Sequence, residues 1–160
     1  MVLVAPNHIE QGTGKLIYTE TAEQQNAISG KYLFESGDVI YSKIRPNLRK
    51  SIIANFSGLC SADMYALRPK NNIIKDRYLL AILLGDHFTL FAESRCIRTG
   101  IPKINREELS EYPVPIPELD IQEKICDEFR QIDSLLLSGI YSKQEIQRVL
   151  YLLLKNVFTI

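Results

Sequence analysis

The stretch Tyr112-Pro113-Val114-Pro115-Ile116-Pro117 divides the sequence into two parts of different character. Its alternating prolines exclude a helix and a central β-strand, because proline lacks an N–H group and its ring clashes with a preceding helical turn. The stretch is too short for a free linker, so we predict an extended connector. We therefore expect two units, residues 1–117 and residues 118–160.

Residues after the connector have the pattern of a long amphipathic helix. Asp120 followed by Glu123 resembles a capping box, with aspartate in place of Ser or Thr. Apolar residues then recur every three or four positions, which places them on one helix face. The stripe consists of Ile121, Ile125, Phe129, Ile132, Leu136 and Ile140, and Ile146, Leu150, Leu153 and Val157 continue it. One helix, or two collinear ones, of about 38 residues would be roughly 57 Å long.

This stripe predicts a partner helix. A domain on the other side of the connector cannot cover all of it, and burying one such side chain is worth about 1.5–3 kcal/mol. We therefore expect a homodimer in which two C-terminal helices pair antiparallel about a two-fold axis. The alternative is a hairpin that turns at Gly139 and buries the stripe within one chain.

Residues before the connector read as short strands followed by helices. Strand-forming residues gather in Lys15–Tyr18, Lys31–Phe34, Asp38–Ser42, Ser51–Asn55 and Met64–Arg68, with Ser57-Gly58 as one of the intervening turns. The spacing changes between Tyr78 and Phe91 to that of one or two helices, and Asn105 could cap a further short turn. We therefore expect an α+β fold, a small and mostly antiparallel β domain with packed helices, followed by a long C-terminal α-helix that forms a coiled-coil arm.

Composition restricts the class of protein. Hydrophobic residues make up 46% and charged residues 24%, as in ordinary globular domains. The longest apolar runs, Leu79–Leu84 and Val149–Leu154, are far shorter than the ~20 residues of a membrane span. The three cysteines are scattered, which argues for a reducing compartment and against a disulfide framework or zinc site. We expect a cytoplasmic protein with no membrane segment and no metal.

Catalytic signatures are missing from the sequence. Gly12-Thr13-Gly14-Lys15 is not a phosphate-binding loop, because Leu16 stands where Ser or Thr is required. No Asp or Glu is followed two positions later by Lys, as the usual metal-dependent nuclease motif requires. Neither His8 nor His87 has a second ligand at helical spacing, so we expect surface or helix-end histidines. These observations argue for a binding protein and against an enzyme.

Positive charge is concentrated before the connector. Residues 1–105 contain 13 Lys and Arg against 9 Asp and Glu, from totals of 19 and 19. The segment Lys43–Lys50 holds four cations and no acid around a proline turn, and its candidate DNA-binding residues are Lys43, Arg45, Asn47, Arg49 and Lys50. Such a turn can neutralise phosphates, while Arg and Asn can read base edges. The alternative is a solvated hairpin tip.

A second basic segment lies between Arg95 and Lys103. Its candidate DNA-binding residues are Arg95, Arg98, Thr99, Gly100 and Lys103. Glycine would let the backbone approach a phosphate or adopt a positive φ. The alternative makes Gly100 a helix C-cap. Two basic loops on one fold could hold a duplex.

Four stretches together resemble the specificity subunits of type I restriction–modification systems. Ser36–Pro46 resembles the family's Gly-Asp strand and basic turn, and Thr99–Asn105 resembles its Gly-x-Pro-x-Ile-Asn stretch. Val114–Ile125 is similar to the family's Pro-rich entry into a conserved helix, and Asn7–Gly14 fits the opening of such a domain. The resemblance covers nearly the whole chain, in the family's order and spacing.

The resemblance implies a DNA-binding target-recognition domain, residues 1–117, joined to a conserved helix, residues 118–160. In the family, two such halves occur in tandem, their helices pair antiparallel and dock methyltransferase subunits, and each domain reads part of a bipartite site. The whole complex methylates adenine and, with a restriction subunit, cleaves unmethylated DNA.

For this chain the resemblance implies a half-subunit that is shortened at its N-terminus and is not an enzyme. Its partners would be double-stranded DNA, a methyltransferase subunit and, through it, a restriction subunit. S-adenosylmethionine, ATP and Mg would belong to those partners, leaving no cofactor in this chain. The alternative function is a scaffold that pairs and binds methyltransferase without reading DNA.

Overall fold

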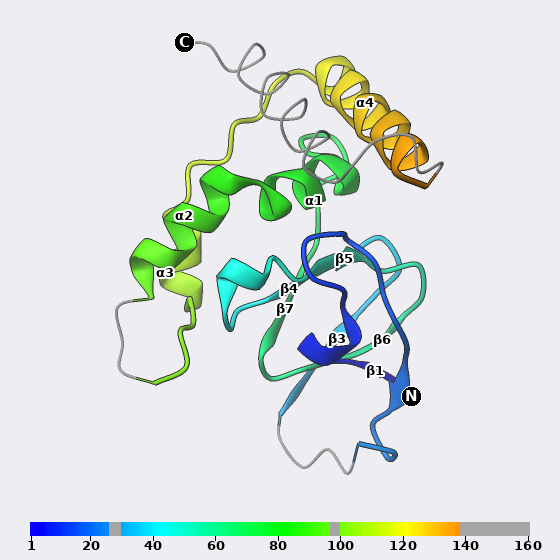
Figure 1. Ribbon diagram of the computed structural model, residues 1–160, viewed down its shortest axis with the longest axis vertical. Coiled ribbons are helices and arrows are strands. Elements are labelled where there is room, and N and C mark those ends of the chain that lie inside the picture. The colour runs from blue at the N-terminus through cyan, green and yellow to red at the C-terminus, as the bar shows by residue number, and fades with distance from the viewer. Residues whose placement is uncertain (26–29, 97–99, 138–160) are drawn as a thin grey trace.

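The structure is a computed structural model that describes residues 1–25, 30–96 and 100–137. Two small β-sheets face each other, helices cover the outer face of one sheet, and a last helix lies against the first of those helices (Figure 1). The expected α+β class, with mostly antiparallel sheets and packed helices, is confirmed. The elements in chain order are β1 (Val2–Val4), η1 (Pro6–His8), β2 (Glu20–Thr21), β3 (Lys31–Phe34), β4 (Val39–Ser42), η2 (Pro46–Leu48), β5 (Ser51–Ile53), β6 (Gly58–Ser61), β7 (Met64–Leu67), α1 (Asp76–Leu84), α2 (Asp86–Arg95), α3 (Arg106–Ser110) and α4 (Leu119–Leu137).

Strand β4 is the centre of the fold. It lies in the middle of the three-stranded sheet β5-β4-β7, and all four of its residues are buried. Side chains alternate along a strand, so Val39 and Tyr41 point to the helices while Ile40 points to the other sheet. The Tyr41 ring meets the edge of Phe88 on α2, with centroids 5.4 Å apart. A strand buried on both faces explains the continuous apolar run in this part of the sequence.

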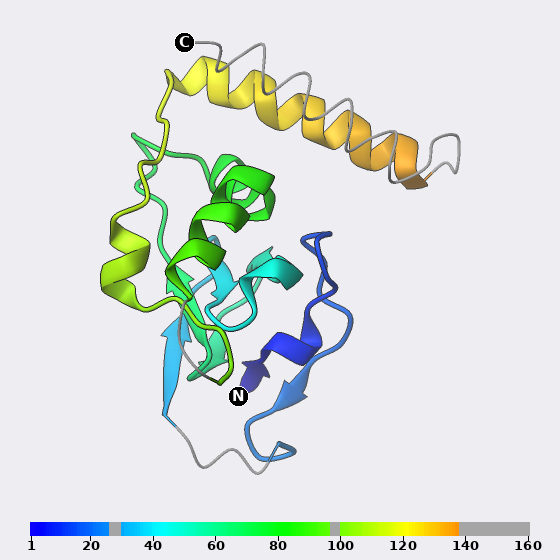
Figure 2. The same cartoon turned by 60° about the vertical axis from the view of Figure 1, so that its left-hand side comes forward.

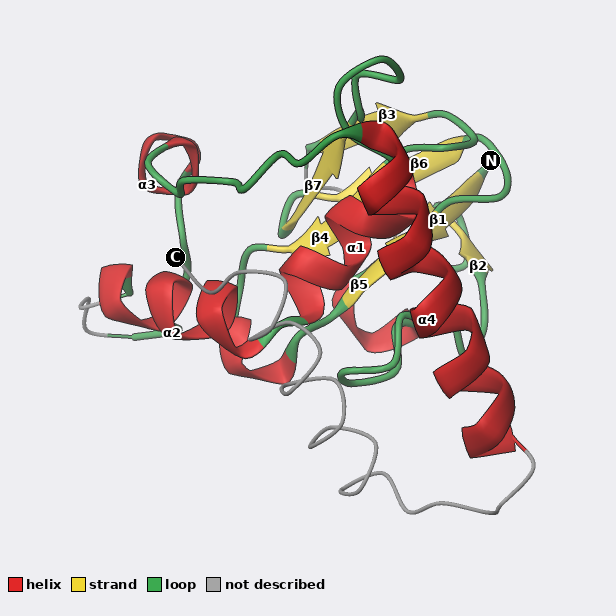
Figure 3. Ribbon diagram, turned by 90° about the horizontal axis from the view of Figure 1, so that it is seen from above, coloured by secondary structure: helices red, strands yellow, loops and turns green. Residues whose placement is uncertain are grey.

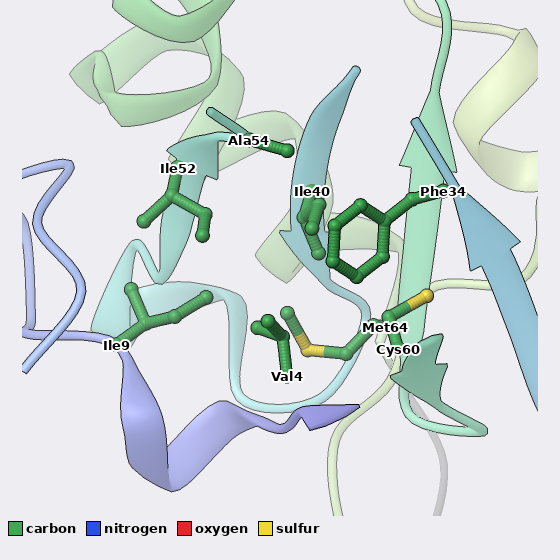
Figure 4. Close-up of a cluster of buried hydrophobic side chains, with 8 residues drawn as sticks. All are labelled: Val4, Ile9, Phe34, Ile40, Ile52, Ala54, Cys60 and Met64. Atoms are coloured by element: carbon green, nitrogen blue, oxygen red, sulfur yellow. The ribbon is translucent and has the colours of Figure 1, made fainter. Parts of the chain in front are cut away.

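The second sheet has the strand order β2-β1-β6-β3 and packs against the first through a shared apolar cluster. Its strands are antiparallel except for β1 and β6, which run parallel. Figure 4 shows the cluster between the sheets, which consists of Val4, Ile9, Phe34, Ile40, Ile52, Ala54, Cys60 and Met64. A separate cluster joins β4 and β7 to α1 and α2.

One strand prediction and one turn prediction are wrong. Lys15–Tyr18 forms no strand, because only Leu16 makes an isolated bridge, to Ile9. Gly58, predicted in a turn, is the first residue of β6. A Cβ atom there would lie 2.8 Å from the Val2 carbonyl oxygen and 2.8 Å from the Phe34 ring. The lack of a side chain at this position therefore allows the neighbouring strands to approach closely.

The helix predictions before the connector are confirmed, and one after it is wrong. Two helices, α1 and α2, follow the strands where the residue spacing changes. Asn105 caps α3 by accepting a 2.9 Å hydrogen bond from the Glu108 N–H. Asp120, predicted as a cap, lies inside α4. The Glu118 carbonyl instead accepts the first N–H groups, from Ile121 and Gln122.

An ion pair between the buried Asp38 and the exposed Arg68 holds the turn before β4. The Asp38 carboxylate, 4% exposed, accepts hydrogen bonds from Arg68 Nε at 2.8 Å and Nη2 at 3.0 Å, and from the Glu35 N–H at 2.8 Å. The hydrogen bonds from Arg68 lower the pKa of Asp38 and outweigh its burial. The carboxylate therefore stays charged and fixes the start of β4 against the end of β7.

The connector forms neither helix nor strand, as predicted, but it does not separate two independent units. Tyr78 on α1 donates a 3.1 Å hydrogen bond to the Pro115 carbonyl. The fully buried amide of Gln122 accepts from the Lys75 N–H at 2.9 Å and donates to the Ile73 and Pro117 carbonyls at 2.8 Å each. The first part of α4 is thus attached to the body through α1.

This attachment corrects part of the stripe prediction. Ile125 is 7% exposed and packs with Cys126 and Phe129 against Tyr78, so the body covers these positions itself. Ile121 remains 37% exposed. Helix α4 crosses over α1 and its C-terminal part extends past the body (Figure 2 and Figure 3). Residues 138–160, with the predicted stripe positions Ile140, Ile146, Leu150, Leu153 and Val157 and the bend at Gly139, lie outside the described residues.

Replacing Gln122 with Leu tests this attachment. The variant keeps the side chain's bulk but leaves the Lys75 N–H and the Ile73 and Pro117 carbonyls unpaired, so unfolding free energy should fall by about 2–4 kcal/mol. Urea denaturation measures the change. Gln131→Leu, on an exposed position of the same helix, should stay within about 0.5 kcal/mol. Equal stabilities for the two variants would contradict the role of Gln122.

Candidate nucleic-acid interface

The two basic segments lie side by side, although more than forty residues separate them in sequence. Ile44 and Lys103 form an antiparallel bridge. The Arg45 N–H donates to the Pro102 carbonyl at 2.8 Å, and the Ile104 N–H donates to the Lys43 carbonyl at 2.9 Å. The structure therefore places Lys43, Arg45 and Lys103 in one neighbourhood.

A short 3-10 turn presents part of the first segment to solvent. Residues Pro46–Leu48 form η2, and the residues on either side, Arg45 (φ 48°, ψ 62°) and Arg49 (φ 47°, ψ 47°), are left-handed. Pro46 is buried, whereas Arg45 and Asn47 are exposed at the tip. Because the turn is anchored by its proline, these two polar side chains are held outward from a defined backbone.

Two of the predicted DNA-binding cations have protein partners. The Arg49 guanidinium contacts Asp86 at 2.5 Å and the Leu84 carbonyl at 3.4 Å. Lys50 donates a 2.7 Å hydrogen bond from Nζ to the Pro6 carbonyl. Both side chains are directed to the body of the protein, so we leave them out of the proposed DNA-contacting set.

Aromatic rings support two further cations beside the bridge. Lys43 lies over the Tyr65 ring at 5.5 Å, and Arg106 lies over both Tyr65, at 5.6 Å, and Tyr32, at 5.4 Å. The Tyr65 hydroxyl donates to the Ile104 carbonyl at 3.2 Å, and burial raises the pKa of Tyr65, so the hydroxyl keeps its proton. Arg106 was missed in the sequence, where the only signal was a cation following the Asn105 cap.

The second segment contributes less than its sequence suggests. Arg95 pairs with Glu111 at 2.9 Å and lies over Phe91 at 5.1 Å, whereas Lys103 is exposed. Gly100 has φ +113°, a conformation that favours glycine. It is not a helix cap, because α2 ends at Arg95 with Cys96 as its cap residue. The predicted residues Arg98 and Thr99 lie outside the described residues.

The histidines and acids form no metal site in the part of the chain that the structure describes. His8, expected at the surface or at a helix end, is the last residue of η1 and is fully buried, with Nδ1 3.1 Å from the Leu3 carbonyl and Nε2 3.1 Å from Glu20. His87 is exposed, and its Nδ1 lies 3.0 Å from the Tyr112 hydroxyl.

Within the described residues, no helix has the length and apolar character needed to cross a membrane.

Comparisons with known proteins identify the same family as the sequence motifs. The model of the family described as "Type I restriction modification DNA specificity domain" matches residues 6–155. The type I restriction enzyme EcoDI specificity subunit of Escherichia coli is 45% identical over 129 residues, which cover 81% of this chain and 28% of the relative. The EcoAI specificity subunit of Escherichia coli is 32% identical over 109 residues, covering 64% of this chain and 18% of the relative.

The fold is also that of a solved specificity subunit. The HsdS subunit from Thermoanaerobacter tengcongensis superposes with a TM-score of 0.72 at 20% identity, covering 92% of this chain and 37% of that chain. The chain therefore spans only part of its relatives, 28% and 18% of the two Escherichia coli subunits. The resemblance indicated by the sequence motifs is confirmed, and the chain belongs to the family of type I restriction–modification DNA specificity domains.

Proposed function

We propose that this chain is a sequence-specific DNA-recognition half-subunit of a type I restriction–modification system. The observation that carries the proposal is the bridge between Ile44 and Lys103, which holds the two basic segments next to each other. Family membership supports the same function. Methylation of adenine and cleavage of unmethylated DNA would be performed by methyltransferase and restriction subunits, to which we also assign S-adenosylmethionine, ATP and Mg.

The basic face consists of Lys43, Arg45, Asn47, Lys103 and Arg106. Within the described residues, none of its four cations makes an ion pair with an acid. Each phosphate neutralised by such a cation releases counterions and contributes about −0.9 to the slope of log K against log salt. Lys103 is exposed and suits a phosphate, whereas Arg45 and Asn47 at the turn tip suit base edges, since Arg matches guanine and Asn matches adenine.

The aromatic supports are consistent with this division of roles. Lys43 and Arg106 are each held against a ring, which orders their side chains before DNA arrives. A cation that is ordered in advance loses less side-chain entropy on binding. Tyr65, buried under both cations, therefore serves as the platform of the basic face.

A salt titration on a selected DNA site tests the proposal. The chain should enrich one short sequence from a randomised duplex library, and Lys103→Ala should weaken binding to all sequences alike, with the salt slope reduced by about 1. Lys70→Ala, an exposed cation in the connection between β7 and α1, is the charge-matched control and should leave the slope unchanged. A library that stays unselected while the chains still pair would point to the scaffold function instead.

We also propose that two chains pair through the part of α4 that extends past the body. Ile125 and Phe129 are packed within the chain, so pairing would use the next positions of the sequence pattern, beginning with Ile132 and Leu136. An antiparallel pair of arms would place two recognition bodies at opposite ends, suited to an inverted and interrupted site. Methyltransferase subunits would dock on the same arms.

Sedimentation tests the pairing. Leu136→Asp places a charge on the stripe and should convert a micromolar dimer to monomer, while each half keeps weak and salt-sensitive DNA binding. Ser134→Asp, an exposed position on the same helix, adds the same charge and should leave the dimer intact. A wild-type chain that is strictly monomeric at high micromolar concentration would contradict the pairing.

A further inference from the structure

We infer that Arg49 is a positioning residue that fixes the turn carrying Arg45 and Asn47, and so sets sequence preference without touching DNA. The inference rests on the proposed function and deepens it, because it identifies what holds the base-reading turn in place. Arg49 was predicted as a DNA contact together with its neighbours, and its surroundings assign it a different role.

The Arg49 guanidinium occupies the junction between α1 and α2. Nη2 lies 2.5 Å from Oδ1 of Asp86, the first residue of α2, and Nη1 lies 3.4 Å from the carbonyl of Leu84, the last residue of α1. Carbonyl groups in the last turn of a helix lack partners within the helix, so this one is free to accept. The planar guanidinium reaches both acceptors at once, which a lysine ammonium does less well.

The accessibility of the two partners indicates which of them faces the protein. The Arg49 side chain is 27% exposed and Asp86 is 66% exposed, so the guanidinium lies beneath its carboxylate. Contact with a DNA phosphate would require this ion pair to break. Arg45 and Asn47, four and two residues before Arg49, are exposed and need no such rearrangement.

The backbone of the turn gives a physical reason for this restraint. Arg45 and Arg49 both have positive φ, a conformation that is unfavourable for a bulky residue and persists only where neighbouring contacts enforce it. On the Arg45 side the enforcing contact is the hydrogen bond to Pro102. On the Arg49 side it is the guanidinium pair, helped by a 3.3 Å hydrogen bond from the Gly12 N–H to the Arg49 carbonyl.

The inference predicts that two substitutions on opposite sides of the pair behave alike. Arg49→Gly removes the guanidinium yet accepts the positive φ, so the fold is spared. Asp86→Asn removes the partner's charge and leaves Arg49 in place. Each variant should lower the ratio of affinities for the selected and a scrambled duplex by about tenfold, with an unchanged salt slope on the scrambled duplex. The double variant should be no worse than Arg49→Gly alone.

A direct contact between Arg49 and phosphate predicts a different pattern. Arg49→Gly would then reduce the salt slope by about 1 on every duplex, and Asp86→Asn would release a cation and tighten binding to both duplexes. Either result would overturn the inference, as would additive effects in the double variant. Lys70→Ala serves again as the charge-matched control.

Amide hydrogen exchange without DNA separates this inference from the proposed function. The N–H groups of Arg45 and Leu48 are both hydrogen-bonded in the turn, to Pro102 and Arg45, and should exchange faster in both variants than in the wild type. Unchanged exchange there would refute the positioning role, whatever the DNA result. A wild-type chain that prefers no sequence would refute the proposed function, while faster exchange in the variants would still support the role of Arg49 in holding the turn.

Discussion

The antiparallel bridge between Ile44 and Lys103 is the contact on which the proposed recognition face depends. It joins the turn that follows the central strand β4 to the loop between α2 and α3. Its two hydrogen bonds would be weak alone, but Ile104 beside them is fully buried in the cluster between sheet and helices. Burial of one isoleucine therefore fixes the relative position of Lys43, Arg45 and Lys103. It also sets the start of α3, and with it Arg106, over the Tyr65 ring.

Helix α1 connects this face to the arm. At its N-terminal end the Lys75 N–H and the Ile73 carbonyl bind the buried amide of Gln122 on α4. At its C-terminal end the Leu84 carbonyl accepts from Arg49 in the basic turn. The helix has nine residues, so about 13 Å separates the two attachments. The direction of α4 relative to the basic turn is thus set by one short rigid element, as the proposed pairing of two chains through α4 would require.

Much of this fold could be predicted from the sequence, because its signals are local. The strand-forming residues of β3, β4, β5 and β7, the spacing of the two helices after them and the Asn105 cap are all signals between near neighbours in sequence. The Gly58 error comes from contacts that are distant in sequence, with the Val2 carbonyl and the Phe34 ring. The partners of Arg49 and Lys50, Asp86 and Pro6, are also distant in sequence and could not be predicted. Arg106 was missed for the same reason, because the two tyrosine rings that it contacts lie on β3 and β7, far from it in sequence.

The central claim is that two separate segments form a single DNA-contacting face. Site-specific crosslinking tests it most directly, with a photoreactive amino acid placed in turn at Arg45, Lys103 and Lys70 on a duplex that carries the selected site. The account predicts crosslinks from Arg45 and Lys103 to the same or adjacent base pairs, and none from Lys70. Crosslinks from Arg45 without any from Lys103, or crosslinks from Lys70 as strong as those from both, would contradict it.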